Sequence, residues 1–277
     1  MWGVDASKIQ LTMNFDPATL TLLFLAAFLA GAMNSVAGGG TLLTFPALLA
    51  ILTPLYHENA GAIANATSTV ALLPGSVAAV WGYRKEMHEA RAFAWRLLPS
   101  SILGSILGSF LLLWMPDRFT PLVPWLLLTA AVLFLIQPVV SHLRKTAPEG
   151  RPVSPLKLGL LVLLQLVVAT YGGYFGAGMG IVILATLGFM GLSNIHHANG
   201  VKTLLASVVN GISALLFFWG GLVHTPLAVF MAVAAILGGY AGARVARKLP
   251  TKAIRWVVIV VAFGLAGYYA WKQFFTS

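Results

Sequence analysis

One lysine stands apart from the other charged residues of this chain. Lys202 lies within an apolar stretch, and it is the only Lys or Arg between Lys157 and Arg244. No acidic residue follows Glu149, so the sequence near Lys202 offers no carboxylate to pair with it. A lysine inside a membrane costs about 2.5–3.5 kcal/mol on insertion scales and marks a functional residue by default. An anionic substrate would supply the missing countercharge; the alternative is that the side chain snorkels to the membrane interface.

Neutral polar residues accompany this lysine and recur in the first half of the chain. Hydroxyl and amide donors bind an oxyanion without the strong attraction that would prevent its release. The alternative role for each is an interhelical hydrogen bond. The candidate substrate-binding residues of this kind are Asn199, Thr203 and Asn210 around Lys202, and Asn65, Thr67 and Ser68 in the first half.

A glycine run interrupts the first apolar stretch, in GAMNSVAGGGTLLTFPALL from Gly31 to Leu49. Glycine costs about 1 kcal/mol relative to alanine inside a helix, so the run predicts a break. Such a break can present backbone N–H groups to an anion, next to the partly positive start of a helix. Close helix packing is the alternative, and we prefer it for Gly104/Gly108 and Gly238/Gly242. The candidate anion-binding residues of the break are Asn34, Ser35, Gly38, Gly39, Gly40 and Thr41.

The same pattern returns in the second half of the chain. AMNSVAGGGTLL (Ala32 to Leu43) resembles GGYFGAGMGIVI (Gly172 to Ile183) at an offset of 140 residues. Gly176, Gly178 and Gly180 are therefore the second set of candidate anion-binding glycines. Repeats with glycine-interrupted segments at matching positions are typical of secondary transporters, which bind substrate near the membrane midplane.

The composition explains which elements must position these residues. Of the 277 residues, 59% are hydrophobic and 9% are charged, which excludes an ordinary soluble domain. Runs of 18 or more apolar residues predict a membrane protein with many helices. We expect ten segments, near residues 18–37, 41–52, 62–83, 95–114, 120–141, 156–175, 179–191, 197–220, 224–245 and 253–274. The second and seventh are short and would span or form re-entrant half-helices.

The net charge of +10 reflects loop lysines and arginines rather than a nucleic-acid-binding surface. These residues concentrate in the loops after the third, fifth and ninth segments. By the positive-inside rule those loops are cytoplasmic and both termini are extracytoplasmic. Five segments per half then give the two halves opposite orientations.

Other classes of function are poorly supported. The chain has no cysteine, no GxSxG motif and no HExxH motif, so thiol chemistry is excluded and an intramembrane hydrolase is the weaker alternative. All seven acidic residues fall in loops or termini, which disfavours a cation transporter. We expect no metal and no cofactor. His57, His196 and His197 flank segment ends and are candidates for proton coupling.

The glycine motifs and the residues after them resemble the TauE/SafE family, also called the 4-toluene sulfonate uptake permease family. The similar pieces are GAMNSVAGGGTLLTFPAL, FGAGMGIVI, ANGVKTLLASVVNGISALLFF and AGARVARKL at 241–249. The resemblance implies an inner-membrane carrier for sulfite, sulfonates or related anions, often an exporter. Met179 departs from the pattern, because the first half has Gly39 at that position.

The sequence thus predicts an all-α polytopic membrane protein of two inverted repeats, with eight full spans plus two short segments, or ten segments. The expected parts are an N-terminal segment (1–17), a first repeat (18–141), a cytoplasmic linker (142–155) and a second repeat (156–275). The expected function is secondary transport of a small sulfur-containing anion by alternating access, and a passive anion channel is the alternative. The expected partners are that anion, the lipid bilayer and a second copy of the chain.

Overall fold

The computed structural model of the protein describes residues 15–36, 39–145, 154–192, 194–245 and 251–275. Within these ranges the secondary structure is helical. The helices are α2 (Pro17–Val36), α3 (Thr41–Tyr56), the 3₁₀ turn η1 (His57–Asn59), α4 (Ala60–Gly82), α5 (Arg84–Glu89), α6 (Arg91–Trp114), α7 (Pro116–Lys145), α8 (Pro155–Tyr174), α9 (Met179–Phe189), α10 (Ile195–Trp219), α11 (Thr225–Val245) and α12 (Thr251–Phe275).

Each of the ten predicted segments corresponds to one helix of 11 to 30 residues, which confirms the all-helical membrane architecture. Three features differ from the prediction. The second segment continues to Tyr56 before η1 turns the chain into α4, and the basic loop after α4 contains the short helix α5, which the sequence did not predict. Helix α7 also extends to Lys145, into the predicted linker.

Six stretches of the described chain are long and apolar enough to cross a membrane, fewer than the eight full spans predicted. The stretch from Thr41 to Gly82 counts as one of them although it contains both α3 and α4, and α9 and the apolar part of α11 are shorter. The other five are Pro17–Asn34, Arg91–Trp114, Pro116–His142, Pro155–Tyr174 and Ile195–Trp219. The division into inverted repeats stays a prediction.

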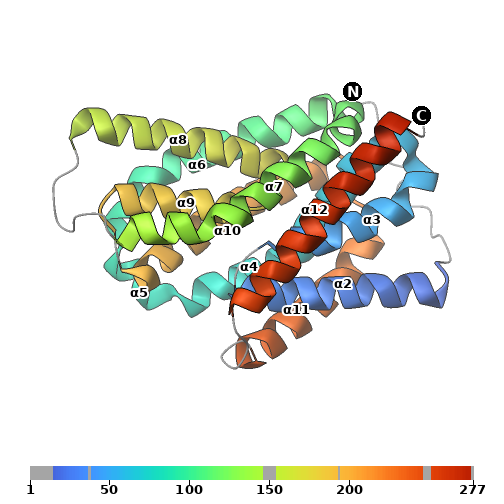
Figure 1. Ribbon diagram of the computed structural model, residues 1–277, viewed down its shortest axis with the longest axis horizontal. Helices are drawn as coiled ribbons and strands as arrows, with labels where there is room; N and C mark the ends of the chain where they lie inside the picture. Colours follow the sequence, from blue (N-terminus) through green and yellow to red (C-terminus); the bar gives the residue numbers. More distant parts are fainter. Residues whose placement is uncertain (1–14, 37–38, 146–153, 193, 246–250, 276–277) are drawn as a thin grey trace.

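The helices pack in pairs that join the two halves of the chain. Helix α6 lies along α8 on one side of the molecule, and α11 lies along α2 on the other (Figure 1). Glycines allow this close approach: a Cβ placed on Gly108 would lie 2.0 Å from the Thr170 carbonyl oxygen, and one on Gly238 would lie 1.8 Å from that of Phe28. Gly104 likewise faces the backbone of Leu166. The packing role predicted for Gly104, Gly108 and Gly238 agrees with these contacts.

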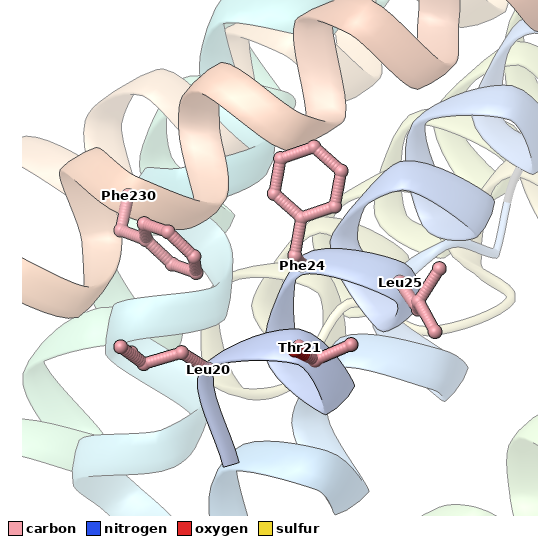
Figure 2. Close-up of a pocket in the computed structure, with 5 residues that line it drawn as sticks. All are labelled: Leu20, Thr21, Phe24, Leu25 and Phe230. Carbon is pink, nitrogen blue, oxygen red and sulfur yellow. The ribbon is translucent and has the colours of Figure 1, made fainter. Parts of the chain in front are cut away.

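A pocket lies along the α2–α11 pair (Figure 2). Leu20, Thr21, Phe24 and Leu25 of α2 and Phe230 of α11 line it. Four of these five side chains are apolar and none is charged. This pocket therefore offers no charged group to an anion, and the one hydroxyl in its lining, that of Thr21, donates to the carbonyl of Pro17.

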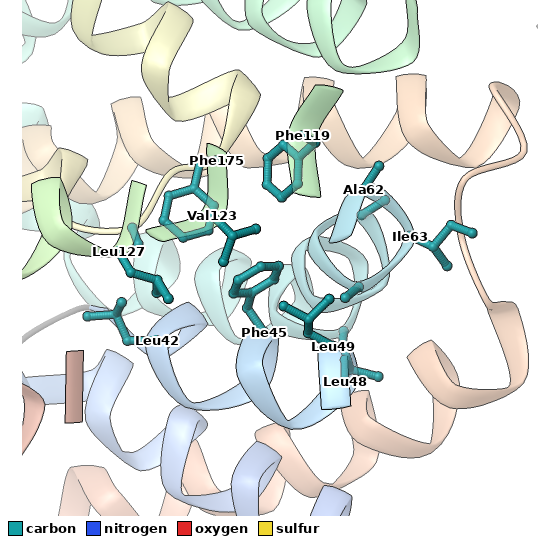
Figure 3. Packing of buried hydrophobic residues seen from close by; sticks show 14 of the residues in the cluster. Leu42, Phe45, Leu48, Leu49, Ala62, Ile63, Phe119, Val123, Leu127 and Phe175 are labelled. Atoms are coloured by element: carbon teal, nitrogen blue, oxygen red, sulfur yellow. The ribbon is translucent and has the colours of Figure 1, made fainter. Parts of the chain in front are cut away.

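The hydrophobic core lies where α3, α4 and α7 meet the end of α8 (Figure 3). Phe45 of α3 contacts Phe175, just after α8, with ring centroids 5.3 Å apart, and Phe119 of α7 contacts both rings at 6.0 Å. These edge-on and tilted arrangements are favoured between aromatic rings. The core thus ties the first half of the chain to the second glycine segment.

Candidate functional site

The second glycine segment forms a turn between α8 and α9. Gly176 and Gly178 have φ of 85° and 82°, in the left-handed region that favours glycine. The hydroxyl group of Tyr171 donates a hydrogen bond of 2.7 Å to the carbonyl of Ala177 and so braces the turn. This geometry confirms that the glycines break the apolar stretch and allow α9 to start at Met179.

Lys202 lies against the first turn of α9. A Cβ placed on Gly180 would lie 3.3 Å from Cδ of Lys202 and 3.7 Å from its Cγ, so the lysine stem covers this glycine. The ammonium nitrogen is two bonds beyond Cδ. A second polar group lies near the same turn: a Cβ placed on Gly176 would be 3.8 Å from Oδ1 of Asn210. The structure thus brings Lys202, Asn210 and the second glycine turn together.

The electrostatics of this region favour an anion. Lys202 is partly buried. Within the described ranges, the contacts between a basic side chain and a carboxylate join Arg118 to Asp117 and His197 to Glu89, so no carboxylate there pairs with Lys202. The start of a helix carries partial positive charge, and α9 begins beside this lysine. Two positive groups with no described counter-ion attract negative charge to the same place.

The backbone groups of both glycine turns form hydrogen bonds within the protein, and at the first turn a side chain, that of Asn34, takes part as well. Gly39 has a φ of 90°, and Gly40 donates its N–H to Oδ1 of Asn34 at 2.8 Å. The N–H groups of Leu42 and Leu43, just after Thr41 at the start of α3, bond to the carbonyls of Gly39 and Gly40. Gly38 and the side chain of Ser35 lie outside the described residues.

Ser68 belongs to this internal network. Its hydroxyl is 2.6 Å from that of Thr44, and Thr44 also donates to the carbonyl of Gly40. Both side chains are fully buried. The hydroxyl pair therefore fastens α4 to the start of α3.

The two glycine turns converge on one turn of α7. A Cβ on Gly39 would lie 2.4 Å from Cζ of Phe134, and one on Gly178 would lie 3.2 Å from Cδ1 of Leu133. Since Phe134 and Leu133 are consecutive residues, both breaks pack against the same part of this helix.

Asn65 connects α4 to the second turn. Its Nδ2 donates a hydrogen bond of 3.0 Å to the carbonyl of Tyr174, at the end of α8. Its Oδ1 is buried and has no hydrogen-bond partner among the described residues. An unpartnered acceptor here suits a water molecule or a hydroxyl group of a bound ligand.

Other predicted residues lie elsewhere. Asn199 and Thr203 are partly buried on α10, next to Lys202 in sequence. Thr67 accepts a hydrogen bond of 3.0 Å from the backbone N–H of His224 and so contacts the connection between α10 and α11. His224 is buried and was missed by the sequence analysis, because a single histidine in a short connection gives no pattern.

The three histidines expected to couple protons lie at helix ends. His57 is exposed and directly follows the last residue of α3, at the other end of that helix from Gly40; its φ is 46°. His196 is exposed at the start of α10, and Nε2 of His197 is 2.7 Å from Oε2 of Glu89 in α5. The His197–Glu89 contact joins the start of α10 to the basic connection between α4 and α6.

Comparison with known proteins adds a second line of information. A sequence model of the family described as Sulfite exporter TauE/SafE matches residues 23–269. The chain is 30% identical over 266 residues to a protein of Haemophilus influenzae named Probable membrane transporter protein, covering 94% of this chain and 98% of that protein.

Two further relatives are similar over most of their length. Probable membrane transporter protein ORF9 of Sinorhizobium sp is 30% identical over 253 residues, which cover 89% of this chain and 90% of that protein. Probable membrane transporter protein YfcA of Escherichia coli K12 is 29% identical over 250 residues, 89% of this chain and 88% of that protein. No solved structure matches the chain.

Proposed function

The chain belongs to the Sulfite exporter TauE/SafE family and is a membrane transporter, and from this premise we propose that it carries a small sulfur-containing oxyanion such as sulfite or an organosulfonate. The position of Lys202 is the observation that supports this most directly. Its stem covers Gly180 at the start of α9, and no described carboxylate pairs with it. An oxyanion at this place would accept hydrogen bonds from the ammonium group and neutralise its charge.

The neighbouring residues would complete the site. Asn210 lies near Gly176, and Asn199 and Thr203 flank Lys202 on α10. In this proposal the second glycine turn contacts the anion, whereas the first turn, with Asn34 and Ser68, shapes the opposite wall. Asn65 Oδ1 would accept a hydrogen bond from a protonated oxygen of the substrate or from its water.

The packing of the helices supports transport by alternating access. Helix α6 of the first half pairs with α8 of the second, and α11 of the second pairs with α2 of the first, which is the reciprocal arrangement. Contacts between α4 and α10 and between α7 and α12 also join corresponding helices of the two halves. This pattern is the one expected if the halves are inverted repeats around a central site. Motion of one set of pairs against the other would expose the site to each side in turn.

Direction, coupling and placement belong to the same proposal. We infer export across the inner membrane from the family, which is described as sulfite exporters. The distribution of basic residues supports placing both termini on the extracytoplasmic side. Coupling to protons through a histidine would allow an exporter to work against a gradient.

The test is transport by purified protein in liposomes loaded with unlabelled sulfite. We expect counterflow of labelled sulfite that saturates, and competition by sulfonates stronger than competition by acetate. Saturable counterflow requires a carrier, so a flux that rises linearly with concentration and shows no counterflow would instead indicate an anion channel. Equal competition by every anion would contradict a sulfur-specific site.

A further inference from the structure

His224 is a buried titratable residue in the connection between α10 and α11. Only 1% of its surface is exposed. It follows the end of α10 at Trp219 and directly precedes Thr225, the first residue of α11. His197 lies near the opposite end of α10, so the two histidines are separated by most of the length of a helix of 25 residues.

The contacts of His224 indicate which nitrogen carries the proton in the neutral ring. The backbone N–H of Leu227 points to Nδ1 of the imidazole at 3.4 Å. Because a backbone amide only donates hydrogen bonds, Nδ1 must be unprotonated, and the neutral ring carries its proton on Nε2. Nε2 is buried and has no hydrogen-bond partner in the described part of the chain.

The surroundings oppose a second proton on the ring. Protonation of Nδ1 would remove the acceptor of the Leu227 N–H and would place a cation at the partly positive start of α11. A buried cation without a counter-ion is unfavourable. Burial accordingly lowers the pKa of His224 below its usual value of about 6.5.

The elements around His224 contribute few other ionisable groups. Helix α4, which contacts its backbone through Thr67, has none between Ala60 and Gly82, and α11 has none before Tyr240. Helix α10 has none after Lys202. Phe15 packs edge-on against the imidazole at 6.0 Å, and its neighbour Asp16 is exposed and hydrogen-bonded to Thr19. Among the described residues at this end of α10, His224 is thus the group whose charge would change on mild acidification.

We propose that His224 is a proton-binding site of the transporter, and that protonation of Nδ1 releases the start of α11 from the connection that Thr67 holds. The proton comes from the aqueous phase and stays on the ring until the contact forms again. The link of this site to transport rests on the proposed function. Thr67 lies on the same helix as Asn65, and α11 lies along α2, so a change at His224 would reach both halves of the protein.

A measurement of thermal unfolding tests the proton site without any substrate. In His224→Asn, the side-chain oxygen of asparagine can accept the Leu227 N–H, because asparagine is a favoured residue directly before a helix. Asparagine does not bind a proton in this pH range. Protonation favours the state in which the imidazole is hydrated, so the wild-type midpoint should fall by at least about 2 °C between pH 8 and pH 5 relative to His224→Asn. The exposed His88→Asn serves as the control and should follow the wild type. The same pH dependence in wild type and His224→Asn would overturn the proposal.

A second measurement tests coupling, with sulfite accumulation driven by a pH gradient in liposomes. His224→Asn should lose about 90% or more of gradient-driven accumulation while it retains sulfite counterflow. Accumulation equal to wild type would contradict coupling through His224. If the wild type itself moves no sulfite, the proposed substrate is wrong, and the unfolding measurement still decides whether His224 binds the proton.

Discussion

The stem of Lys202 lies across Gly180, so closely that a Cβ on this glycine would be 3.3 Å from the lysine Cδ. This contact places Lys202, which lies two turns into α10, against the first turn of α9. Neither residue alone indicates a site, because helix starts and membrane lysines both occur for structural reasons. Together they place the lysine charge and the partly positive start of α9 side by side, next to a glycine turn. The described residues supply no counter-ion for this positive charge.

Removal of the charge should weaken anion binding. A charge-assisted hydrogen bond contributes about 1.5–3 kcal/mol, so we expect Lys202→Ala to raise the Kd for sulfite about 10–150-fold. Binding to purified protein, followed by calorimetry or tryptophan fluorescence, measures this change. The protein should fold normally, because the substitution removes from a partly buried position a charge that has no partner among the described carboxylates.

The matched control for this prediction is Lys85→Ala in α5, which removes an exposed lysine from the basic connection. Its Kd for sulfite should stay within about twofold of wild type, because exposed charges are screened by salt. Equal affinity of Lys202→Ala and Lys85→Ala would mean that Lys202 only reaches toward the membrane surface.

A methyl group on Gly180 should separate binding from stability. The neighbour that Gly180→Ala would displace is the flexible stem of Lys202, so the fold can adapt at little cost. The ammonium group would move with the stem. We therefore expect a several-fold rise in the Kd for sulfite with little change in the melting temperature.

Gly178→Ala is the contrasting variant for the same turn. Its φ of 82° is strained for alanine, by about 1–2 kcal/mol, and its Cβ would contact Leu133. This variant should lower the melting temperature. A Gly180→Ala protein that melts as early as Gly178→Ala would show that Gly180 serves packing rather than the site.

The buried hydroxyl pair at the first turn should act on stability rather than on affinity. Thr44 and Ser68 are 2.6 Å apart and satisfy each other, so they have little capacity left for a ligand. A double-mutant cycle of Thr44→Val and Ser68→Ala should give a coupling of about 0.5–1.5 kcal/mol in unfolding. Sulfite affinity should change less than twofold in each variant. A large loss of sulfite affinity in Ser68→Ala but not in Thr44→Val would indicate that Ser68 contacts the substrate.

The sequence predicted the helices well because the signal for a membrane helix is local. An uninterrupted apolar run such as 156–175 leaves few alternatives, and α8 extends from Pro155 to Tyr174. The glycine breaks were also local signals, and Gly39, Gly176 and Gly178 all adopt positive φ. Helix α5 could not be predicted in this way, because its six residues, RKEMHE, include one apolar residue and form no apolar run.

The contacts that assemble the site could not be predicted, because they join residues far apart in sequence. Asn65 reaches the carbonyl of Tyr174, 109 residues away, and Thr67 reaches His224, 157 residues away. In sequence, Asn65 and Thr67 looked like equivalent members of one polar cluster. On a helix they face different neighbours, so one lies at the second glycine turn and the other at the start of α11. For His224 the one available signal was its position directly before Thr225-Pro226, a combination that often starts a helix.

The contact between α6 and α8 yields a prediction about the fold rather than the site. A Cβ on Gly108 would lie 2.0 Å from the carbonyl oxygen of Thr170, a rigid backbone atom, so Gly108→Ala must push the two helices apart. We expect a loss of roughly 1–3 kcal/mol of stability and a lower yield of folded protein. Gly159→Ala in α8 is the control, because no atom lies within 4 Å of its Cβ position, and it should be neutral or stabilising by about 0.4–1 kcal/mol. Thermal unfolding in detergent compares the two variants. Since α6 and α8 come from different halves of the chain, equal stability of both variants would mean that this pair does not hold the halves together.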